Sequence, residues 1–190
     1  MDQAVIVVLA VLAVVGQVLI ALMLLIGLLA LLGVHGPLNA VRRSLWGYEL
    51  WGGFLVAAIA TGGSLFFSEI RGFLPCDLCW FQRICMYPLS GLMLLMAWHG
   101  DTRASRYLLP LPVFGAGVSI YQLLIEHGVI TEPASCSILP GVGCGTHWIN
   151  EFGYITIPLL ALTDFLLLIG FLVLASTGIA DDAATLPADA

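Results

Sequence analysis

The sequence predicts an all-α integral membrane protein: a four-helix transmembrane bundle with one extra transmembrane helix at its N-terminus. Of the 190 residues, 61% are hydrophobic and only 9% are charged, and the mean hydropathy is +1.06. These values lie far outside the range of an average globular domain. Apolar segments long enough to cross a hydrocarbon core of about 30 Å recur five times along the chain. We therefore predict a single five-span membrane domain over residues 1–176.

The first predicted span, residues 4–34, is the extra helix. No basic residue precedes it, its apolar run is about 30 residues long and no Ala-x-Ala cleavage site follows, so we predict a retained helix rather than a removable signal peptide. The four bundle helices are predicted at residues 46–67, 79–98, 107–125 and 152–176. Residues 177–190 are small, polar and acidic, which predicts a disordered cytoplasmic tail.

The distribution of arginine predicts the orientation of the spans. All six basic residues are arginines. Arg42 and Arg43 lie between the first and second spans, and Arg103 and Arg106 between the third and fourth, whereas residues 126–151 contain no Lys or Arg. Basic residues concentrate in short cytoplasmic loops. We therefore predict a multi-pass protein of the plasma or inner membrane, with its N-terminus outside the cell and its C-terminus in the cytoplasm.

Four of the five cysteines form two pairs in polar gaps, and this orientation puts both pairs on the extracytoplasmic face. Cys76 and Cys79 stand at the start of the third span, and Cys136 and Cys144 lie between the fourth and fifth spans. Outside the cytosol such pairs can cycle through disulfides or persist as them. The net charge of −6 gives no indication of nucleic-acid binding. These observations predict redox chemistry at a membrane surface.

The first pair is a Cys-x-x-Cys motif at a predicted helix N-terminus. Unpaired N–H groups and the positive end of the helix dipole favour a thiolate there. Arg83 lies one turn deeper and about 40° round the helix from Cys79, so its guanidinium can reach back beneath the sulfur. An arginine this far inside a span favours a functional site over snorkelling to the interface. Cys85 points elsewhere and is predicted to be a small buried apolar residue.

The second pair, Cys136 and Cys144, lies in a segment rich in proline and glycine. A disulfide there closes a short ring and, taken alone, is typical of a structural staple. Beside a Cys-x-x-Cys on the same face, it is more consistent with a loop disulfide that swings to the helix-end pair and relays electrons by thiol exchange.

Three other interpretations of the cysteines and histidines are less favourable. Covalent haem attachment requires Cys-x-x-Cys-His, but Trp80 follows Cys79. A zinc site built from both pairs is disfavoured because Cys-x7-Cys is wide for a zinc knuckle, so no metal is predicted. A membrane haem needs histidines inside the spans, whereas the four histidines lie at segment ends or in loops.

With these residues in place, the chain resembles the DsbB family, the membrane thiol:quinone oxidoreductases that reoxidise a soluble extracytoplasmic dithiol oxidase. The resemblance covers roughly residues 46–176 and rests on Cys76-x-x-Cys79, on Arg83 and on the second cysteine pair. Four strings resemble in particular the Gram-positive branch, BdbC: Pro-Cys-Asp-Leu-Cys-Trp-Phe-Gln-Arg (75–83), Met-Tyr-Pro (86–88), Trp-Ile-Asn (148–150) and Ile-Thr-Ile-Pro (155–158).

The resemblance implies a role for each paired cysteine. A soluble thioredoxin-like partner, DsbA-like in kind, would attack Cys136 of a Cys136–Cys144 disulfide. The released Cys144 would attack Cys76 of a Cys76–Cys79 disulfide. Cys79 would then face a bound quinone, either ubiquinone or menaquinone, and Arg83 would help to hold the quinone and stabilise negative charge.

The sequence departs from the family pattern in three places: the extra first span, the short separation of the loop cysteines and an Asp164 near the middle of the last span. A carboxylate at that depth is usually neutral or paired. Gln17 lies at comparable depth in the extra helix, so we predict an Asp164–Gln17 clasp that docks this helix. The alternative is that Asp164 carries a proton for quinone reduction.

Two other functions stay open at the level of sequence. A vitamin K epoxide reductase-like enzyme is similar in bundle and chemistry, but there the loop pair precedes the Cys-x-x-Cys in the chain, and here it follows. A non-catalytic membrane protein, with outer loops merely stapled by two disulfides, would be inert to a thioredoxin-like protein and independent of quinone.

Overall fold

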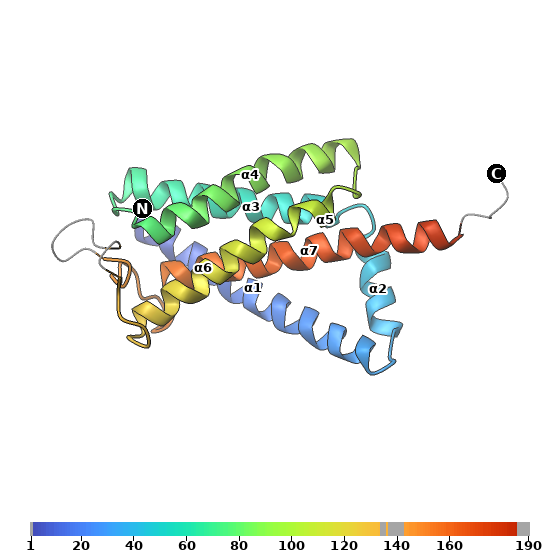
Figure 1. Ribbon diagram of the computed structural model, residues 1–190, viewed down its shortest axis with the longest axis horizontal. Helices are drawn as coiled ribbons and strands as arrows, with labels where there is room; N and C mark the ends of the chain where they lie inside the picture. Colours follow the sequence, from blue (N-terminus) through green and yellow to red (C-terminus); the bar gives the residue numbers. More distant parts are fainter. Residues whose placement is uncertain (1, 134–135, 137–142, 186–190) are drawn as a thin grey trace.

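The computed structural model describes residues 2–133, 136 and 143–185, with side chains described for residues 3–176 of these. Helices make up most of this part of the chain (Figure 1). The helices are α1 Asp2–Leu31, α2 Gly36–Leu45, α3 Glu49–Leu65, the π-helix η1 Phe66–Ile70, α4 Asp77–His99, α5 Ser105–Leu108, α6 Pro110–Glu126 and α7 Ile157–Thr185.

Five helical segments are long and apolar enough to cross a membrane, which confirms the predicted fold class. They are Gln3–Leu31, Glu49–Ile70, Asp77–His99, Ser105–Glu126 and Ile157–Ser176. The last span begins at Ile157 rather than at the predicted residue 152. Phe152 and Gly153 have φ angles of 54° and 79°, and a backbone with positive φ does not continue a right-handed helix.

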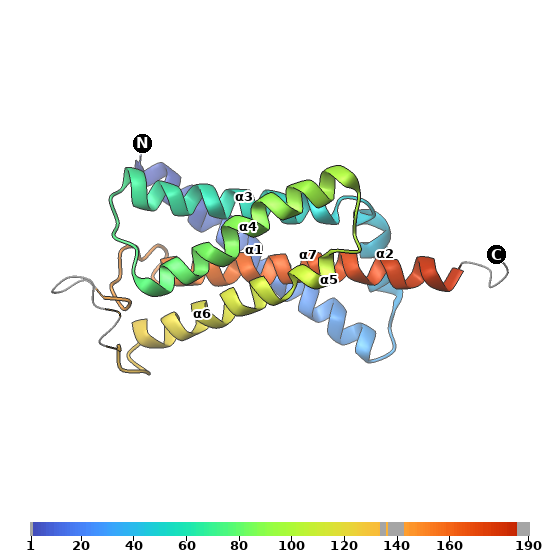
Figure 2. The same cartoon turned by 45° about the horizontal axis from the view of Figure 1, so that its top comes forward.

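Helices α3, α4, α6 and α7 pack lengthwise into a four-helix bundle (Figures 1 and 2). Its fully buried side chains include Leu89, Met93, Phe165, Leu168 and Leu172. Helices α6 and α7 approach closely at Gly115, where a Cβ atom would lie 2.4 Å from the ring of Phe165, as small residues permit in membrane helices. Cys85 is buried in the same core, which confirms its prediction as a small apolar residue.

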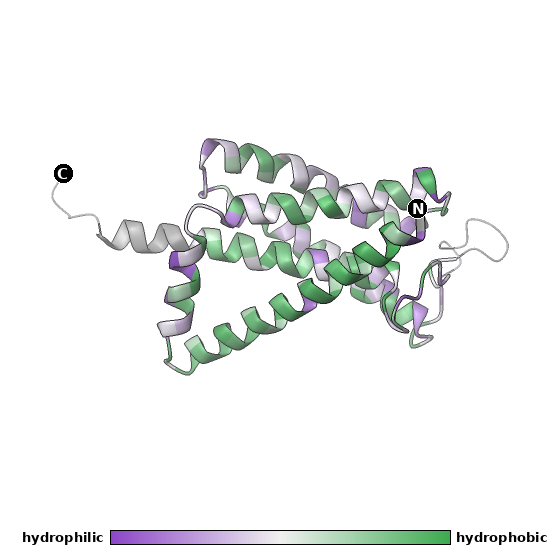
Figure 3. Ribbon diagram, turned by 180° about the vertical axis from the view of Figure 1, so that it is seen from behind, coloured by the Kyte–Doolittle hydropathy of each residue, from purple (hydrophilic) through white to green (hydrophobic). Residues whose placement is uncertain are grey.

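The extra helix, α1, packs on the bundle with its first half and diverges from it with its second (Figures 1 and 3). Ala10 and Ala13 are buried, and a Cβ atom on Gly16 would lie 3.0 Å from side-chain atoms of Thr163 and Leu167 on α7. Many apolar side chains of the second half are exposed, up to 86% at Leu31, although Met23 still contacts α7 beside Gly170. Figure 3 shows α1 coloured as hydrophobic along almost its whole length, as expected for a helix in lipid.

The predicted clasp between Asp164 and Gln17 is wrong. The side-chain carbonyl of Gln17 accepts a hydrogen bond from the Tyr154 hydroxyl at 3.1 Å. Within the described residues, no hydrogen bond joins Gln17 to Asp164. The neighbouring Gly16 faces α7, which turns Gln17 toward the segment that precedes α7. Gln17 therefore helps to dock α1, but through a different partner.

A short helix absent from the sequence-based prediction, α2, joins α1 to α3 at the end of the molecule opposite the cysteines (Figure 1). Leu38, Val41 and Leu45 are half-buried along one side of it, whereas Arg43 is exposed. This amphipathic pattern is typical of a helix that lies in a membrane interface.

At the other end of the chain, α7 continues to Thr185, past the predicted end of the last span at residue 176. The described backbone thus differs from the disordered tail predicted from residue 177. Alanine, the strongest helix former, recurs over residues 180–184, and no proline lies between residues 177 and 186. The sequence of this segment is therefore compatible with a continuing helix. Residues 186–190 of the predicted tail lie outside the described residues.

Candidate active site

Both cysteine pairs gather at one end of the bundle, together with the N-terminus of α1 (Figure 1). The side chain of Gln3 donates a hydrogen bond to Glu151 at 2.9 Å, which ties α1 to the irregular segment at this end. Helix α2, with Arg42 and Arg43 in its last turn, lies at the opposite end. The cysteines and these two arginines thus lie at opposite ends of the bundle, and the extracytoplasmic position of the cysteines stays a prediction.

The first pair stands at a helix N-terminus, as the sequence predicts. Cys76 is the N-cap residue of α4, with an extended backbone, and Cys79 lies in the first turn. Their Sγ atoms are 3.0 Å apart and both cysteines are free, since a disulfide would place the sulfurs about 2.05 Å apart. The pair is therefore a dithiol that can close into a small ring.

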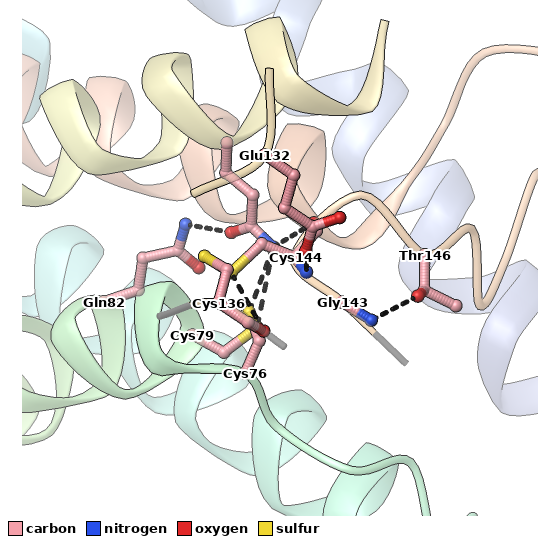
Figure 4. Close-up of a disulfide and its surroundings, with 9 residues drawn as sticks. Cys76, Cys79, Gln82, Glu132, Cys136, Gly143, Cys144 and Thr146 are labelled. Atoms are coloured by element: carbon pink, nitrogen blue, oxygen red, sulfur yellow. Dashed lines mark hydrogen bonds between the residues drawn. A yellow bond between two sulfur atoms is a disulfide. The ribbon is translucent and has the colours of Figure 1, made fainter. Parts of the chain in front are cut away.

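The second pair forms a disulfide, Cys136–Cys144. Cys76, Cys136 and Cys144 are buried against one another, and Cys79 packs beside them. Figure 4 shows the disulfide lying directly over the first turn of α4. This arrangement brings the four sulfurs of the two pairs together. It places a dithiol and a disulfide in contact, as thiol–disulfide exchange requires.

A buried glutamine that the sequence analysis missed connects the two pairs. The side-chain amide of Gln122, on α6, lies 3.5 Å from Cys76 Sγ, 3.6 Å from Cys79 Sγ and 3.3 Å from the carbonyl oxygen of Cys144. Gln82 fixes its orientation by donating a 2.9 Å hydrogen bond to Gln122 Oε1. The signal was present in the sequence, because both are polar residues inside apolar spans, and such residues mark functional sites.

The Cys76 thiol keeps its proton in this arrangement. Its hydrogen bond with Cys79 and its burial both raise the pKa of the Cys76 thiol above its ordinary value. The raised pKa favours the protonated Cys76 thiol, and either sulfur can donate in the contact between the two. Of the two sulfurs, Cys79 is the one that the N-terminal turn of α4 and the Gln122 amide are placed to stabilise as a thiolate.

The disulfide is held from its other side by a carboxylate. The backbone N–H of Cys144 donates to the side chain of Glu132, and the N–H of Gly143 donates to Thr146 Oγ1 at 3.0 Å (Figure 4). A Glu132 oxygen and the sulfurs of Cys136 and Cys144 all lie within 4.8 Å of one another. The backbone around Cys144 is thus fixed by two side chains besides Gln122.

Arg83 is buried rather than snorkelling, with 9% of its surface exposed. Its Nη2 atom donates to the backbone carbonyl of Ser64 on α3 at 3.1 Å, and its guanidinium lies 5.4 Å from the centroid of the Trp80 ring. Arg83 and Cys79 line the same cavity. Because a guanidinium carries five N–H groups, Arg83 can bind Ser64 and still donate into this cavity.

The cavity has a volume of about 290 Å³ and runs from the cysteines into the spans. Polar groups line its outer end, among them Cys79, Arg83 and Gln122, whereas its inner end is lined by apolar side chains of α1, α3 and α7. Polar donors at one end and an inner end that is apolar apart from Asp164 fit a ligand with a carbonyl-bearing ring and a hydrocarbon tail. A quinone has this chemistry.

Two carboxyl groups also line this cavity, Glu126 near the cysteines and Asp164 deeper on α7. Glu126 has a side chain only 2% exposed, and it binds His147 Nδ1 at 3.0 Å and the Thr156 hydroxyl at 2.8 Å. Among the described residues no hydrogen bond or ion pair engages Asp164. The two carboxyl groups therefore differ. Glu126 is held by two side-chain partners, whereas Asp164 has none among the described residues and can interact with a ligand in the cavity.

Comparison with known proteins places these residues in a family. The sequence profile of the family "Disulfide bond formation protein DsbB" matches residues 47–175. The chain is 48% identical over 128 residues to disulfide bond formation protein C of Bacillus subtilis, a match that covers 66% of this chain and 90% of the relative. It is 40% identical over 133 residues to a probable disulfide formation protein of Deinococcus radiodurans, covering 65% of this chain and 86% of the relative. No solved structure matches the chain.

Proposed function

The chain belongs to the DsbB family of membrane disulfide bond formation proteins, and from this premise we propose that it is a thiol:quinone oxidoreductase. It reoxidises a soluble, extracytoplasmic, thioredoxin-like dithiol oxidase and passes the electrons to a membrane quinone. The observation that carries the proposal is the contact between the Cys76/Cys79 dithiol and the Cys136–Cys144 disulfide, at the mouth of a cavity that continues into the membrane spans.

The first step is exchange with the soluble partner. A partner thiolate attacks Cys136 Sγ, the Cys136–Cys144 bond breaks, and Cys144 leaves as a thiolate. The second partner thiol then attacks the partner sulfur of the mixed disulfide, which frees Cys136 and leaves the partner with a disulfide. Two electrons now reside on Cys136 and Cys144.

The second step moves these electrons to the helix-end pair. Cys144 attacks Cys76 of a Cys76–Cys79 disulfide and Cys79 leaves as a thiolate; Cys136 then attacks Cys144, which restores the loop disulfide and releases Cys76. The products are a Cys136–Cys144 disulfide and a Cys76/Cys79 dithiol, which is the redox state found in the structure. Gln122 supports this transfer because it holds both pairs at once.

A quinone in the cavity supplies the electron sink, because it takes up two electrons and two protons to become a quinol. Cys79 faces the cavity and provides the electron pair as its bond with Cys76 re-forms. Arg83 and Gln122 donate hydrogen bonds into the same space and stabilise negative charge there. Asp164 carries a proton, since its carboxyl group lines the cavity and is not engaged elsewhere among the described residues.

A direct assay tests the proposal. Purified protein is mixed with a reduced thioredoxin-like oxidase and a soluble quinone analogue, and quinone absorbance is followed over time. We expect quinone loss that depends on both components. An unchanged absorbance, with partner loading and protein integrity in detergent controlled, would support the alternative of structural disulfides without catalysis.

A trapping experiment tests the assigned roles of the loop cysteines. In a Cys144→Ser variant Cys136 is an unpaired thiol, so it should attack the disulfide of the oxidised partner, while the partner's second sulfur leaves as a thiolate. The resulting mixed disulfide on Cys136 should be found by mass spectrometry, because Cys144 is no longer present to displace the partner. Attachment at Cys76 or Cys79 instead would contradict the order of steps. Labelling of the cysteines from each side of the membrane tests their predicted extracytoplasmic position.

A further inference from the structure

We propose that the added helix α1 forms one wall of the quinone site and holds the isoprenoid tail of the quinone; this rests on the proposed function. The family match begins at residue 47, so α1 lies outside the part of the chain that the family profile describes. The cavity that begins at the cysteines nevertheless extends along this helix.

The part of α1 that lines the cavity is a continuous apolar stripe. Its members are Leu9, Leu12, Ala13, Val15, Gly16 and Leu19. Most recur at intervals of three or four residues, so they share one helix face. Ten residues of helix correspond to about 15 Å along the axis, roughly half of a hydrocarbon core of about 30 Å. The stripe therefore follows the cavity from the outer rim to the middle of the membrane.

The opposite side of this apolar space is formed by α3. Leu55 and Ile59 line the cavity and are 59% and 37% exposed; on α1, Leu12 and Val15 line it and are 44% and 51% exposed. Side chains that both line the cavity and remain exposed mark an opening between α1 and α3. In a membrane this opening faces lipid, which is where a quinone with a long hydrocarbon tail resides.

The opening exists because α1 packs mainly on α7 and less closely on α3. Gly16 brings α1 close to Thr163 and Leu167 of α7, and α1 packs extensively on α7. Against α3 it makes a close approach at Leu9, beside Gly63. Below that contact the two helices leave a wedge of apolar space, continuous with the thiol end of the cavity.

The occupant that fits both ends is a tailed quinone. Its ring meets the donors Arg83 and Gln122 beside Cys79, and its tail leaves along the apolar stripe of α1 toward lipid. A phospholipid acyl chain would fit the inner end alone, because it offers no ring to the thiols. The structure thus assigns to α1 a role in binding the tail, separate from the chemistry at the cysteines.

The test compares two tryptophan variants of α1. Val15→Trp fills the wedge, whereas Val18→Trp, at a side chain that is 63% exposed and does not line the cavity, is the matched control. We expect Val15→Trp to raise KM for a long-tailed quinone about tenfold or more, because loss of about two buried methylene groups weakens binding by that factor. This increase should exceed any change in KM for a tail-less quinone, and Val18→Trp should leave kcat and KM unchanged for both quinones.

The outcomes separate this inference from the proposed function. If the unsubstituted protein fails to reduce the tail-less quinone, the proposed function itself fails. If it reduces the tail-less quinone but Val15→Trp and Val18→Trp have equal KM values for the long-tailed quinone, the role of α1 is overturned.

A second measurement covers the case in which Val15→Trp does not fold. A quinone with a photoreactive group on its tail should crosslink to the α1 peptide of the unsubstituted protein, and excess long-tailed quinone should prevent this. Crosslinking that phospholipid suppresses equally well would assign the wedge to lipid and overturn the inference.

Discussion

The two walls of the cavity differ in chemistry and in origin. The wall formed by α4 and α6 carries the thiols and the buried polar groups Gln82, Arg83 and Gln122. The wall formed by α1 is apolar at every position that lines the cavity. The first belongs to the part of the chain that matches the family, and the second precedes it. This difference is the basis for our proposal that the reaction and the retention of a lipid-soluble acceptor belong to separate helices.

Removal of a reactive sulfur should have the largest effect. We expect Cys79→Ser to lower the rate of quinone reduction by about a thousandfold or more, because loss of a covalent catalyst removes the step that it performs. One equivalent of reduced partner should still be oxidised by the Cys136–Cys144 disulfide. Quinone absorbance and thiol titration measure the two quantities. Cys85→Ala, which changes the buried thiol of the same helix, is the control and should retain turnover.

Loss of the Asp164 carboxyl group should have the second-largest effect. Asp164→Asn keeps the size of the side chain but carries no proton, so quinone reduction should fall about a hundredfold if this group is the proton carrier. Partner exchange at the loop disulfide should be unaffected. Single-turnover measurements of each half-reaction check this. Equal rates for Asp164→Asn and the unsubstituted protein would assign the proton to another group, with Glu126→Gln as the next variant.

The buried guanidinium provides a third test of the polar wall. Arg83→Met should raise KM for quinone and lower kcat, with a combined loss of about 10- to 100-fold, the usual value of a buried hydrogen bond to a charged group. Arg83→Lys keeps the charge and should recover part of the loss. Arg103→Met, at the opposite end of the bundle, is the control. If Arg83→Met reduces stability but leaves kcat/KM intact, its contact with Ser64 is only structural.

The glutamine that joins the two cysteine pairs should have a smaller effect. Gln122→Leu removes the hydrogen bonds to the sulfurs and to Cys144, so electron transfer between the pairs should slow about tenfold. Gln82→Leu should produce part of this change, since Gln82 orients Gln122 through a hydrogen bond. Rapid-quench trapping of thiols reports the rate. A Gln122→Leu variant with normal transfer would show that packing alone aligns the pairs.

The smallest effect is expected at Gln3, near the N-terminus of α1. Gln3→Ala removes an exposed hydrogen bond to Glu151 and should change stability by less than about 0.5 kcal/mol. Thermal unfolding in detergent measures this, and KM for quinone should remain within about twofold of the unsubstituted value. A large increase in KM would mean that the position of α1 depends on its end rather than on its packing against α7.

The fold could be predicted from the sequence to the extent that it depends on local composition. Each span is a long apolar run, so its existence follows from the chain alone, and the Cys-x-x-Cys stands at the start of α4 because the apolar run begins there. The turn at Phe152 and the helix α2 were missed. Both depend on a few residues whose conformation is selected by neighbours and by the interface, not by hydropathy.

The reactive residues of the site could be predicted from the sequence, but the residues that orient them could not. Paired cysteines and an arginine inside a span are rare, so the sequence alone points to them. Gln122, in contrast, binds Cys144 and Gln82, which lie 22 and 40 residues away along the chain, and only the fold brings these residues together. The predicted contact between Gln17 and Asp164 was wrong for the same reason. The sequence predicts which residues lie at the same depth in the membrane, but the angle at which α1 crosses the bundle decides which of these residues Gln17 contacts. Only the packed structure brings Tyr154 to it.

The attachment of α1 to α7 has a consequence for biosynthesis. A ribosome makes α1 first, yet its main docking surface, at Thr163 and Leu167, emerges nearly last. During translation α1 can therefore meet α3 and η1 first, at Leu9 and Ile6, and it reaches its main docking surface only after α7 has been made. The wedge that we propose for the quinone tail therefore takes shape only after all four paired cysteines have been synthesised.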